Sequence, residues 1–170
     1  MEREPDNRRA EACLPDVLRD RATEGVRPMT PDDLDIVFDI EKRAYEFPWT
    51  RGIFRECLRV GYPAWVMERA GDVVAYGIIS VAANEAHILN LCVDPDWQRR
   101  GLGRRMLELL LLAARRLAAE SVFLEVRASN HRAAAIYEQA GFRRIGLRKR
   151  YYRGPDGQRE DAVVLTRPLA

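Results

Sequence analysis

The chain has 170 residues, of which 47% are hydrophobic and 32% are charged, and its formal net charge at pH 7 is +2. That length favours one domain with a single core, and the composition is typical of an ordinary globular protein. So small a net charge gives no argument for a nucleic-acid or membrane partner, and we expect neither. The three cysteines, Cys13, Cys57 and Cys92, are widely spaced, and only two histidines accompany them. The sequence therefore supports neither a disulfide framework nor a metal site.

Signals for export or membrane insertion are also lacking in the sequence. The longest apolar run, residues 106–114, is too short to span a bilayer. The N-terminus has no apolar segment of the kind that forms a signal peptide. Together with the unpaired cysteines, these features predict a reduced, cytoplasmic location.

The N-terminal part of the chain divides into an extension and the start of a domain. Residues 1–24 alternate acidic and basic side chains and carry few large apolar ones. We expect them to form a flexible extension with a helical turn around residues 15–21, and residues 25–170 to form one globular domain. From Thr30-Pro31-Asp32-Asp33, a helix start, a helix should run to about Glu46. Its expected buried positions are Leu34, Val37, Phe38, Ile40 and Ala44.

The remaining elements alternate between strands and helices. After a strand at Val26 and the first helix, a break at Phe47-Pro48-Trp49-Thr50 precedes a short helix that ends near Arg59. Strands are predicted at residues 64–69, 73–82, 86–93, 121–126, 142–150 and 162–167, and helices at 102–119 and 130–140. Gly141 suits the left-handed end of the last helix. This order predicts an α/β fold with a sheet of mixed direction.

The segment from Val93 to Gly103 joins a strand to a helix through Gln98-x-x-Gly101-x-Gly103. Glycine lets a ligand approach the backbone, and the first N–H groups of a helix face outward with the positive end of the helix dipole behind them. A plain strand-to-helix turn would also use glycine. The flanking side chains make a pyrophosphate seat the better interpretation, and they are Arg99, Arg100, Arg104 and Arg105.

Glu125 lies inside the apolar strand Ser121-Val-Phe-Leu-Glu-Val. A carboxylate there is costly unless it is paired or functional, so the structural alternative is an ion pair with Arg127 or Arg148. As a functional group, a partly buried carboxylate is expected to have a raised pKa, which suits a proton acceptor. Two histidines, His87 and His131, lie outside any motif, and we expect them to be structural or surface groups.

The sequence resembles the GNAT superfamily of acetyl-CoA-dependent N-acetyltransferases in its strand, glycine turn and long helix, followed by Asn130 and Tyr137. More narrowly, it resembles the RimI family of ribosomal-protein-alanine N-acetyltransferases. The resemblance covers roughly residues 26–168. It implies a mixed central sheet of about seven strands, with helices on both faces and splayed central strands. Its narrower motifs are Phe47-Pro48-Trp49, Val93-Asp94-Pro95-Asp96, Leu124-Glu125-Val126-Arg127-Ala128-Ser129-Asn130, Tyr137-Glu138, Gly141-Phe142, Tyr151-Tyr152 and Asp156-Gly157 with Glu160-Asp161-Ala162.

The resemblance also implies a role for each candidate residue, with acetyl-CoA as cosubstrate. Glu125 would be the general base, and Tyr137 the acid that protonates the departing thiolate. The backbone N–H of Val93 would polarise the acetyl carbonyl. Coenzyme contacts would come from Leu91, Cys92, Val93, Arg99, Arg100, Gly101, Leu102, Gly103, Arg104 and Asn130, with Cys92 an inert packing residue rather than a nucleophile. The peptide side would be walled by Phe47, Trp49, Tyr151 and Tyr152.

The implied substrate is an N-terminal amine, that of the N-terminal alanine of the eighteenth small-subunit ribosomal protein. An α-amino group with a pKa of about 7.7–8.0 costs only about 1 kcal/mol to deprotonate at pH 7, whereas a lysine near 10.4 costs roughly 4–5 kcal/mol. Other readings are a transferase with broader N-terminal or lysine substrates, or one for a small amine held by the cluster Asp156, Glu160 and Asp161. A non-catalytic acyl-CoA-binding module is a further alternative, and the need for a protein partner stays open.

Overall fold

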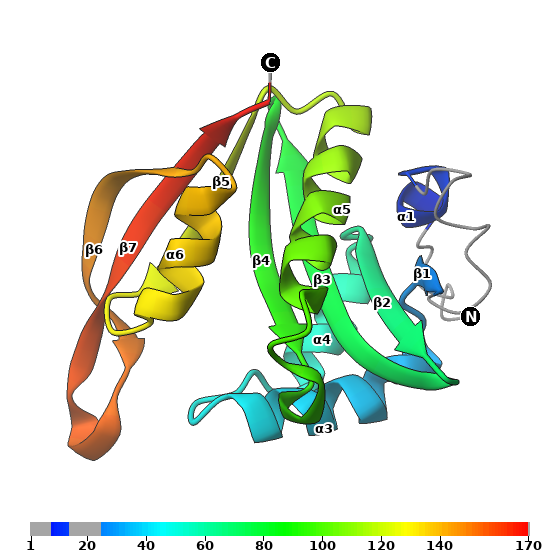
Figure 1. Ribbon diagram of the computed structural model, residues 1–170, viewed down its shortest axis with the longest axis horizontal. Helices are drawn as coiled ribbons and strands as arrows, with labels where there is room; N and C mark the ends of the chain where they lie inside the picture. The colour runs from blue at the N-terminus through cyan, green and yellow to red at the C-terminus, as the bar shows by residue number, and fades with distance from the viewer. Residues whose placement is uncertain (1–7, 14–24, 170) are drawn as a thin grey trace.

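The computed structural model describes residues 8–13 and 25–169, which include a seven-stranded sheet. From Val26 onward, the chain order of the helices and strands matches the predicted order (Figure 1). The helices are α1 (Arg8–Cys13), α3 (Leu34–Ala44), α4 (Arg51–Arg59), α5 (Leu102–Arg116) and α6 (His131–Gln139). The strands are β1 (Val26–Pro28), β2 (Ala64–Arg69), β3 (Asp72–Ala82), β4 (Glu85–Val93), β5 (Ser121–Arg127), β6 (Arg143–Arg153) and β7 (Arg159–Pro168). Short 3-10 turns lie at Pro31–Asp33, Pro95–Trp97 and Pro155–Gly157.

The sheet has the order β1-β2-β3-β4-β5-β7-β6 and is antiparallel except where β4 meets β5. These two strands run parallel and pair only between Glu85–His87 and Ser121–Phe123. Beyond His87 they diverge, and Figure 1 shows them meeting at one end and apart at the other. We call the unpaired stretch of β4, residues 88–93, together with the facing part of β5, the β4–β5 opening. The predicted mixed sheet with splayed central strands is confirmed.

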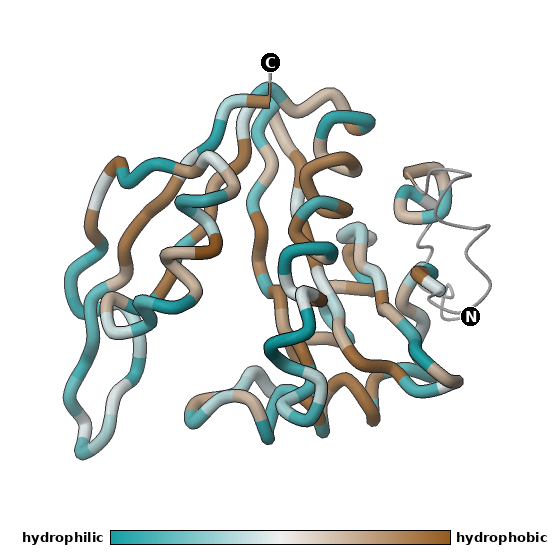
Figure 2. The backbone as a smooth tube through the Cα atoms, viewed as in Figure 1, coloured by the Kyte–Doolittle hydropathy of each residue, from teal (hydrophilic) through white to brown (hydrophobic). Residues whose placement is uncertain are grey.

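Two hydrophobic cores lie on opposite faces of the sheet. One packs β-strand residues such as Ile79 and Leu124 against α5, whose buried positions include Met106 and Leu110. The other packs α3 and α4 against Val66 and the neighbouring strands. Figure 2 shows the apolar segments gathered on the central strands and on α5. The cores hold β1–β4 firmly between two layers of helix.

The structure changes some predictions about the N-terminal part of the chain. Residues 8–13, assigned to a flexible extension, form helix α1, which buries Ala10 and Cys13 against the α5 core. The Trp65 indole N–H donates to the Ala10 carbonyl at 3.2 Å. The helical turn expected around residues 15–21 lies outside the described residues. On α3, Phe38 and Ala44 are only partly buried, whereas Glu41 is 2% exposed.

Across residues 8–13 and 25–169, none of the helices combines the length and the apolar character needed to cross a bilayer.

Candidate active site

The turn between β4 and α5 has the backbone geometry of an anion seat. Gly101 adopts a left-handed conformation with φ +79° and forms the N-cap of α5. Arg105 N–H donates to the Gly101 carbonyl, so the N–H groups of Leu102, Gly103 and Arg104 precede the first intrahelical bond. These three groups face outward at the positive end of the helix dipole. The turn can therefore accept a phosphate group from the solvent side.

Asp94 braces the start of this turn. Its carboxylate accepts two bonds from the Arg43 guanidinium, at 3.0 and 2.7 Å, and a third from the Asp96 N–H at 2.9 Å. The bonds from Arg43 hold the pKa of Asp94 below its usual value. We call the segment from Asp94 to Arg104 the phosphate turn. Because Arg43 lies on α3, the ion pair ties this turn to the helix layer on the opposite face of the sheet from α5.

The backbone groups of β4 face the β4–β5 opening at alternate residues. Asp94 N–H donates to the Val74 carbonyl of β3, and no register irregularity lies between Asp94 and Asn90. Alternation along an antiparallel ladder then turns the N–H groups of Leu91 and Val93 away from β3, toward β5. Those two residues offer peptide groups to a ligand that lies along the strand.

Cys92 faces the other way. Its backbone pairs with Tyr76 of β3, and its side chain is 3% exposed in the α3–α4 core. Burial raises the pKa of the thiol to about 12, so the side chain is a neutral packing group. Tyr45, which the sequence analysis did not single out, donates its hydroxyl to the Leu91 carbonyl at 3.1 Å. Leu91 thus has a fixed carbonyl beside the opening.

Glu125 lies on β5, two residues beyond the last residue that pairs with β4. Its side chain is 9% exposed, and one carboxylate oxygen lies 3.5 Å from the Arg148 guanidinium. The ion pair with Arg148, which was the structural alternative to a catalytic role, is therefore present, whereas Arg127 bonds to Glu160 instead. The predicted raised pKa is wrong: the hydrogen bond from His87 lowers the pKa of Glu125, and burial, which acts in the opposite direction, does not cancel it. The carboxylate is held ionised.

His87 is the partner that the sequence analysis missed. Its Nε2 lies 2.5 Å from Glu125 Oε2, and the imidazole is 35% exposed whereas the carboxylate is largely covered. His87 is the last β4 residue that pairs with β5, so the pair lies where the two strands begin to separate. A polar residue on each of two neighbouring apolar strands was the available signal. His131, by contrast, is an exposed residue at the start of α6.

Three of the four residues expected to wall the peptide side lie around or beside Arg127. Its guanidinium lies 5.5 Å from the Phe47 ring centre and 4.5 Å from that of Tyr152, and Tyr151 packs edge-on against Tyr152 at 5.0 Å. Trp49 instead packs on Phe54, and its backbone N–H donates to Glu41 at 2.9 Å. The structure therefore brings Phe47, Tyr151 and Tyr152 together, while Trp49 belongs to the α4 layer.

Glu41 is a second carboxylate that sequence reasoning missed. It is buried on α3 and accepts hydrogen bonds from the Tyr76 hydroxyl, the Asn90 amide and Trp49 N–H. These donors come from β3, β4 and the loop after α3. Three donors satisfy the buried carboxylate and fix that loop against the strands that form the opening.

Tyr137 and Asn130 are both placed by α6. Asn130 is its N-cap and accepts from Ala133 N–H at 3.1 Å. Tyr137 packs edge-on against Phe142, and burial raises the pKa of its hydroxyl to about 12. Gly141, with φ +88°, ends the helix in the predicted left-handed conformation. The phenol is thus a protonated group throughout the ordinary pH range.

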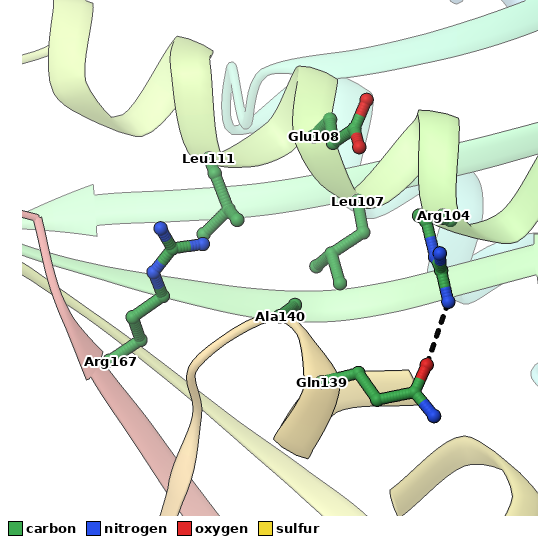
Figure 3. Close-up of a pocket in the computed structure, with 7 residues that line it drawn as sticks. All are labelled: Arg104, Leu107, Glu108, Leu111, Gln139, Ala140 and Arg167. Carbon is green, nitrogen blue, oxygen red and sulfur yellow. Dashed lines mark hydrogen bonds between the residues drawn. The ribbon is translucent and has the colours of Figure 1, made fainter. Parts of the chain in front are cut away.

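A cavity of about 430 Å³ lies between α5 and α6 (Figure 3). Arg104 donates to the Gln139 side chain at 2.7 Å across one side of it, and Arg167 extends from β7 toward Leu111. The charged lining of the cavity consists of two guanidinium groups and the Glu108 carboxylate (Figure 3). The same Arg104 lies in the first turn of α5, so the cavity adjoins the phosphate turn.

The β4–β5 opening therefore combines an anion seat, a strand with outward-facing N–H groups and an ionised carboxylate. The protonated phenol of Tyr137 packs on the same core as Leu91 and Val93. No group of three or more possible metal-ligating side chains occurs within the described parts of the chain. The arrangement offers N–H groups to an anion at the turn and to an extended ligand along β4.

Comparison with known proteins agrees with this arrangement. The chain is 39% identical over 138 residues to the ribosomal protein bS18-alanine N-acetyltransferase of Escherichia coli (strain K12), covering 81% of this chain and 93% of that protein. The crystal structure of the Escherichia coli ribosomal-protein-S18-alanine N-acetyltransferase superposes with a TM-score of 0.81 at 37% identity, over 86% of this chain and 94% of the other. The crystal structure of Ard1 from Thermoplasma volcanium superposes with a TM-score of 0.78 at 26% identity, over 88% of this chain and 99% of the other.

The family pattern described as the Acetyltransferase (GNAT) family matches residues 34–142, which run from α3 through the phosphate turn and β5 to the end of α6. This match covers more than half of the chain, and the alignment with the relative named above covers 81% of it. Together they confirm the predicted use of acetyl-CoA as the cosubstrate. The chain belongs to the GNAT family of acetyl-CoA-dependent N-acetyltransferases.

Proposed function

We propose that this enzyme acetylates the N-terminal α-amine of a ribosomal protein, the N-terminal alanine of bS18. The choice of substrate is supported by the 39% identity to the Escherichia coli bS18-alanine N-acetyltransferase. The single structural observation that carries the chemistry is the ionised Glu125 on β5, just past the point where β4 and β5 stop pairing.

The residues of the opening have distinct tasks in this proposal. The phosphate turn binds the pyrophosphate of acetyl-CoA, and the peptide groups of Leu91 and Val93 hold the extended arm, with the Val93 N–H polarising the acetyl carbonyl. The amine nitrogen bonds to the carbonyl carbon and the carbon–sulfur bond breaks. Glu125 accepts the proton that the nitrogen loses, and Tyr137 donates its proton to the departing sulfur.

A carboxylate with a lowered pKa is a weak base, and the substrate compensates for this. The α-amino group has a pKa of about 7.7–8.0, so an appreciable fraction is neutral at pH 7 and needs no strong base before attack. The nitrogen becomes much more acidic once it has bonded to the carbonyl carbon, and an ionised carboxylate then suffices. The same carboxylate is poorly suited to a lysine, which must lose its proton beforehand.

A small-amine substrate gains no support from the acidic cluster. Glu160 accepts bonds from Arg127 and from Ser129 N–H, at 3.2 and 2.7 Å. Asp161 accepts from Arg150 N–H at 2.8 Å. Two of the three carboxylates are therefore engaged in holding the backbone and side chains of this part of the sheet.

The test is thiol release from acetyl-CoA with a hexapeptide that carries the bS18 N-terminus, beside the same peptide with a blocked N-terminus. We expect turnover with the free peptide alone, and a loss of roughly 10²–10⁴-fold in kcat for Glu125→Gln. The matched control is Glu46→Gln, which makes the same change from carboxylate to amide at an exposed residue after α3. Equal turnover of the blocked peptide, or faster turnover of spermidine, would contradict the proposed substrate.

A further inference from the structure

The edge strand β6 carries an unusual concentration of positive charge. Its eleven residues, Arg-Arg-Ile-Gly-Leu-Arg-Lys-Arg-Tyr-Tyr-Arg, include six basic side chains and no acidic one. The whole chain has a net charge of +2, so the other 159 residues together carry a net charge of −4. The low overall charge, which argued against a polyanionic partner, conceals a strongly basic edge on an otherwise acidic protein.

The carboxylates around β6 do not neutralise this charge. Glu160 is bound by Arg127 and Ser129, Asp161 by the Arg150 backbone, and Glu125 by His87 and Arg148. Within residues 8–13 and 25–169, no carboxylate forms an ion pair with the other five basic side chains of the strand. We call these five the β6 basic edge: Arg143, Arg144, Lys149, Arg150 and Arg153. All five are exposed.

A bulge presents part of this edge together with an aromatic ring. The pairing with β7 shifts between Arg148 and Tyr152, and Arg150 adopts φ +53° in the shifted segment. The Arg150 N–H bond to Asp161 fixes the bulge. Tyr151 is 45% exposed there, with the Arg148 guanidinium 5.3 Å from its ring centre. Exposed rings beside arginines are the elements of a base-stacking surface.

Protection of a sheet edge does not account for these features. β6 forms the outer edge of the sheet, and Figure 2 shows it as largely hydrophilic. One or two charged residues are enough to discourage pairing between edges. Five uncompensated like charges on a single strand repel one another, and an exposed tyrosine adds nothing to edge protection. A polyanion would relieve this repulsion.

We propose that the β6 basic edge, with Tyr151, is a binding surface for single-stranded RNA. The guanidinium groups would contact phosphates, for which their planar fork is suited, and the tyrosine would stack on a base. An acidic protein would use the same charges but would not need an exposed ring beside them, whereas a base can stack on Tyr151, which otherwise belongs only to the expected peptide wall. The choice of RNA also rests on the proposed function, since a ribosomal protein substrate is met in the company of RNA. Arg148 contacts both Glu125 and Tyr151, so the surface adjoins the acetylation site.

The experiment measures fluorescence anisotropy of a labelled single-stranded RNA of about 20 nucleotides with the full-length protein over a series of salt concentrations. The test variant is Arg143→Gln/Arg144→Gln/Lys149→Gln/Arg153→Gln, which spares Arg148 and the strained Arg150. Its matched control, Lys42→Gln/Arg55→Gln/Arg59→Gln/Arg132→Gln, removes the same charge from exposed positions on α3, α4 and α6. Acetylation of the free hexapeptide is measured in parallel.

We expect the test variant to bind RNA at least about tenfold more weakly at low salt. The slope of log K against log salt should become shallower by about 3, since each of the four lost phosphate contacts contributes about 0.7. The control variant should lose much less affinity. Peptide acetylation should be unchanged, so a failure of the proposed function would show as inactive wild-type enzyme and not as altered RNA binding. If the quadruple variant unfolds on thermal melting, the pairs Arg143→Gln/Arg144→Gln and Lys149→Gln/Arg153→Gln are measured separately.

Three results would overturn the inference. Equal losses in the test and control variants would show that only total charge matters. Undetectable RNA binding by the wild-type protein at low salt would show that RNA is not the ligand of this surface. Tighter binding of a polyglutamate peptide than of RNA, lost in the same variant, would assign the surface to an acidic protein instead.

Discussion

The two halves of the sheet differ in how they are held together. Strands β1–β4, the N-terminal half-sheet, lie between α5 on one face and α3 and α4 on the other, and β3 has seven consecutive buried residues. Strands β5, β7 and β6, the C-terminal half-sheet, pack against α6, and neither α6 nor β6 has a fully buried residue. Hydrophobic burial stabilises the first half, whereas polar and cation–π contacts contribute a larger part in the second.

This difference matches the division of tasks in the proposed reaction. The phosphate turn and the peptide groups of β4 belong to the well-packed half, where a rigid backbone suits the binding of an extended coenzyme. Glu125 and Tyr137 belong to the half with the thinner core. We therefore expect substitutions in the C-terminal half-sheet to change activity more than stability, and substitutions beneath the N-terminal half-sheet to do the opposite.

The largest effect is expected for Tyr137→Phe, which removes the hydroxyl of the proposed general acid and keeps the ring. Loss of a positioned general acid should lower kcat by roughly 10²–10⁴-fold with little change in stability. Because the pKa of Tyr137 is raised to about 12, the wild-type enzyme should show no alkaline loss of kcat attributable to this group below about pH 10. A steady-state pH–rate profile measures the loss of kcat and the alkaline limb, with the exposed Tyr62→Phe as control. A profile that falls near pH 8 to 9 in the wild type but not in Tyr137→Phe would place the acid at a different pKa.

The largest loss of stability is expected for Glu41→Ala in the N-terminal half-sheet. The substitution leaves the Tyr76 hydroxyl, the Asn90 amide and the Trp49 N–H without their acceptor, and each unsatisfied buried donor costs about 1–3 kcal/mol. We expect the free energy of unfolding to fall by about 3 kcal/mol, measured by urea denaturation. Glu46→Ala, an exposed carboxylate just past the same helix, should change it by less than about 0.5 kcal/mol. Equal effects would show that Glu41 is not a structural anchor.

The sequence predicted the secondary structure well because its signals are local. The caps, turns and periodic apolar residues that mark α5, β5 and Gly141 lie within a few residues of the elements that they define. Helix α1 gave no such signal, since it has only six residues and buries two of them, Ala10 and Cys13, against a distant core. A short segment that folds by docking cannot be recognised from its own pattern.

The site residues that the sequence analysis missed depend on pairing between distant segments. His87 and Glu125 are 38 positions apart, and Glu41 meets donors 35 and 49 positions further along. Only the register of β4 with β5, and the placement of α3 on the sheet, bring them together. The same reasoning explains the wrong pKa for Glu125: its burial was visible in the sequence, whereas its hydrogen bond to His87 was not.

A pH-dependent effect is expected for His87→Gln, at the junction of the two halves. Removing the imidazole raises the pKa of Glu125, because the hydrogen bond that lowers it is lost while burial remains. The acidic limb of kcat/KM should therefore move to higher pH. The stability that comes from the lowered pKa is fully present above roughly pH 4.3 and is lost as the pH falls through the folded-state value. The variant should accordingly be less stable than wild type at pH 7, with the difference shrinking on acidification.

The same variant distinguishes a role for His87 in holding Glu125 ionised from a role in packing alone. A lower rate at every pH, with the acidic limb unmoved, would indicate a general packing defect and contradict the role in holding the carboxylate ionised. His131→Gln, an exposed histidine on α6, provides the control and should leave the profile unchanged.

The smallest effect is expected for Arg127→Met, which tests the contact between the two halves. Arg127 lies against Phe47, from the loop of the first half, and against Tyr152 of the second, and it also bonds to Glu160. Methionine keeps an apolar stem but loses the cation–π contacts, each worth about 0.5–1 kcal/mol when exposed to solvent. We expect the free energy of unfolding to fall by about 1 kcal/mol and the KM for the peptide to rise several-fold with kcat nearly unchanged. In Arg127→Lys the KM should rise less, because an ammonium still contacts the rings. An unchanged KM in both variants would show that Phe47 and Tyr152 do not form part of the peptide wall.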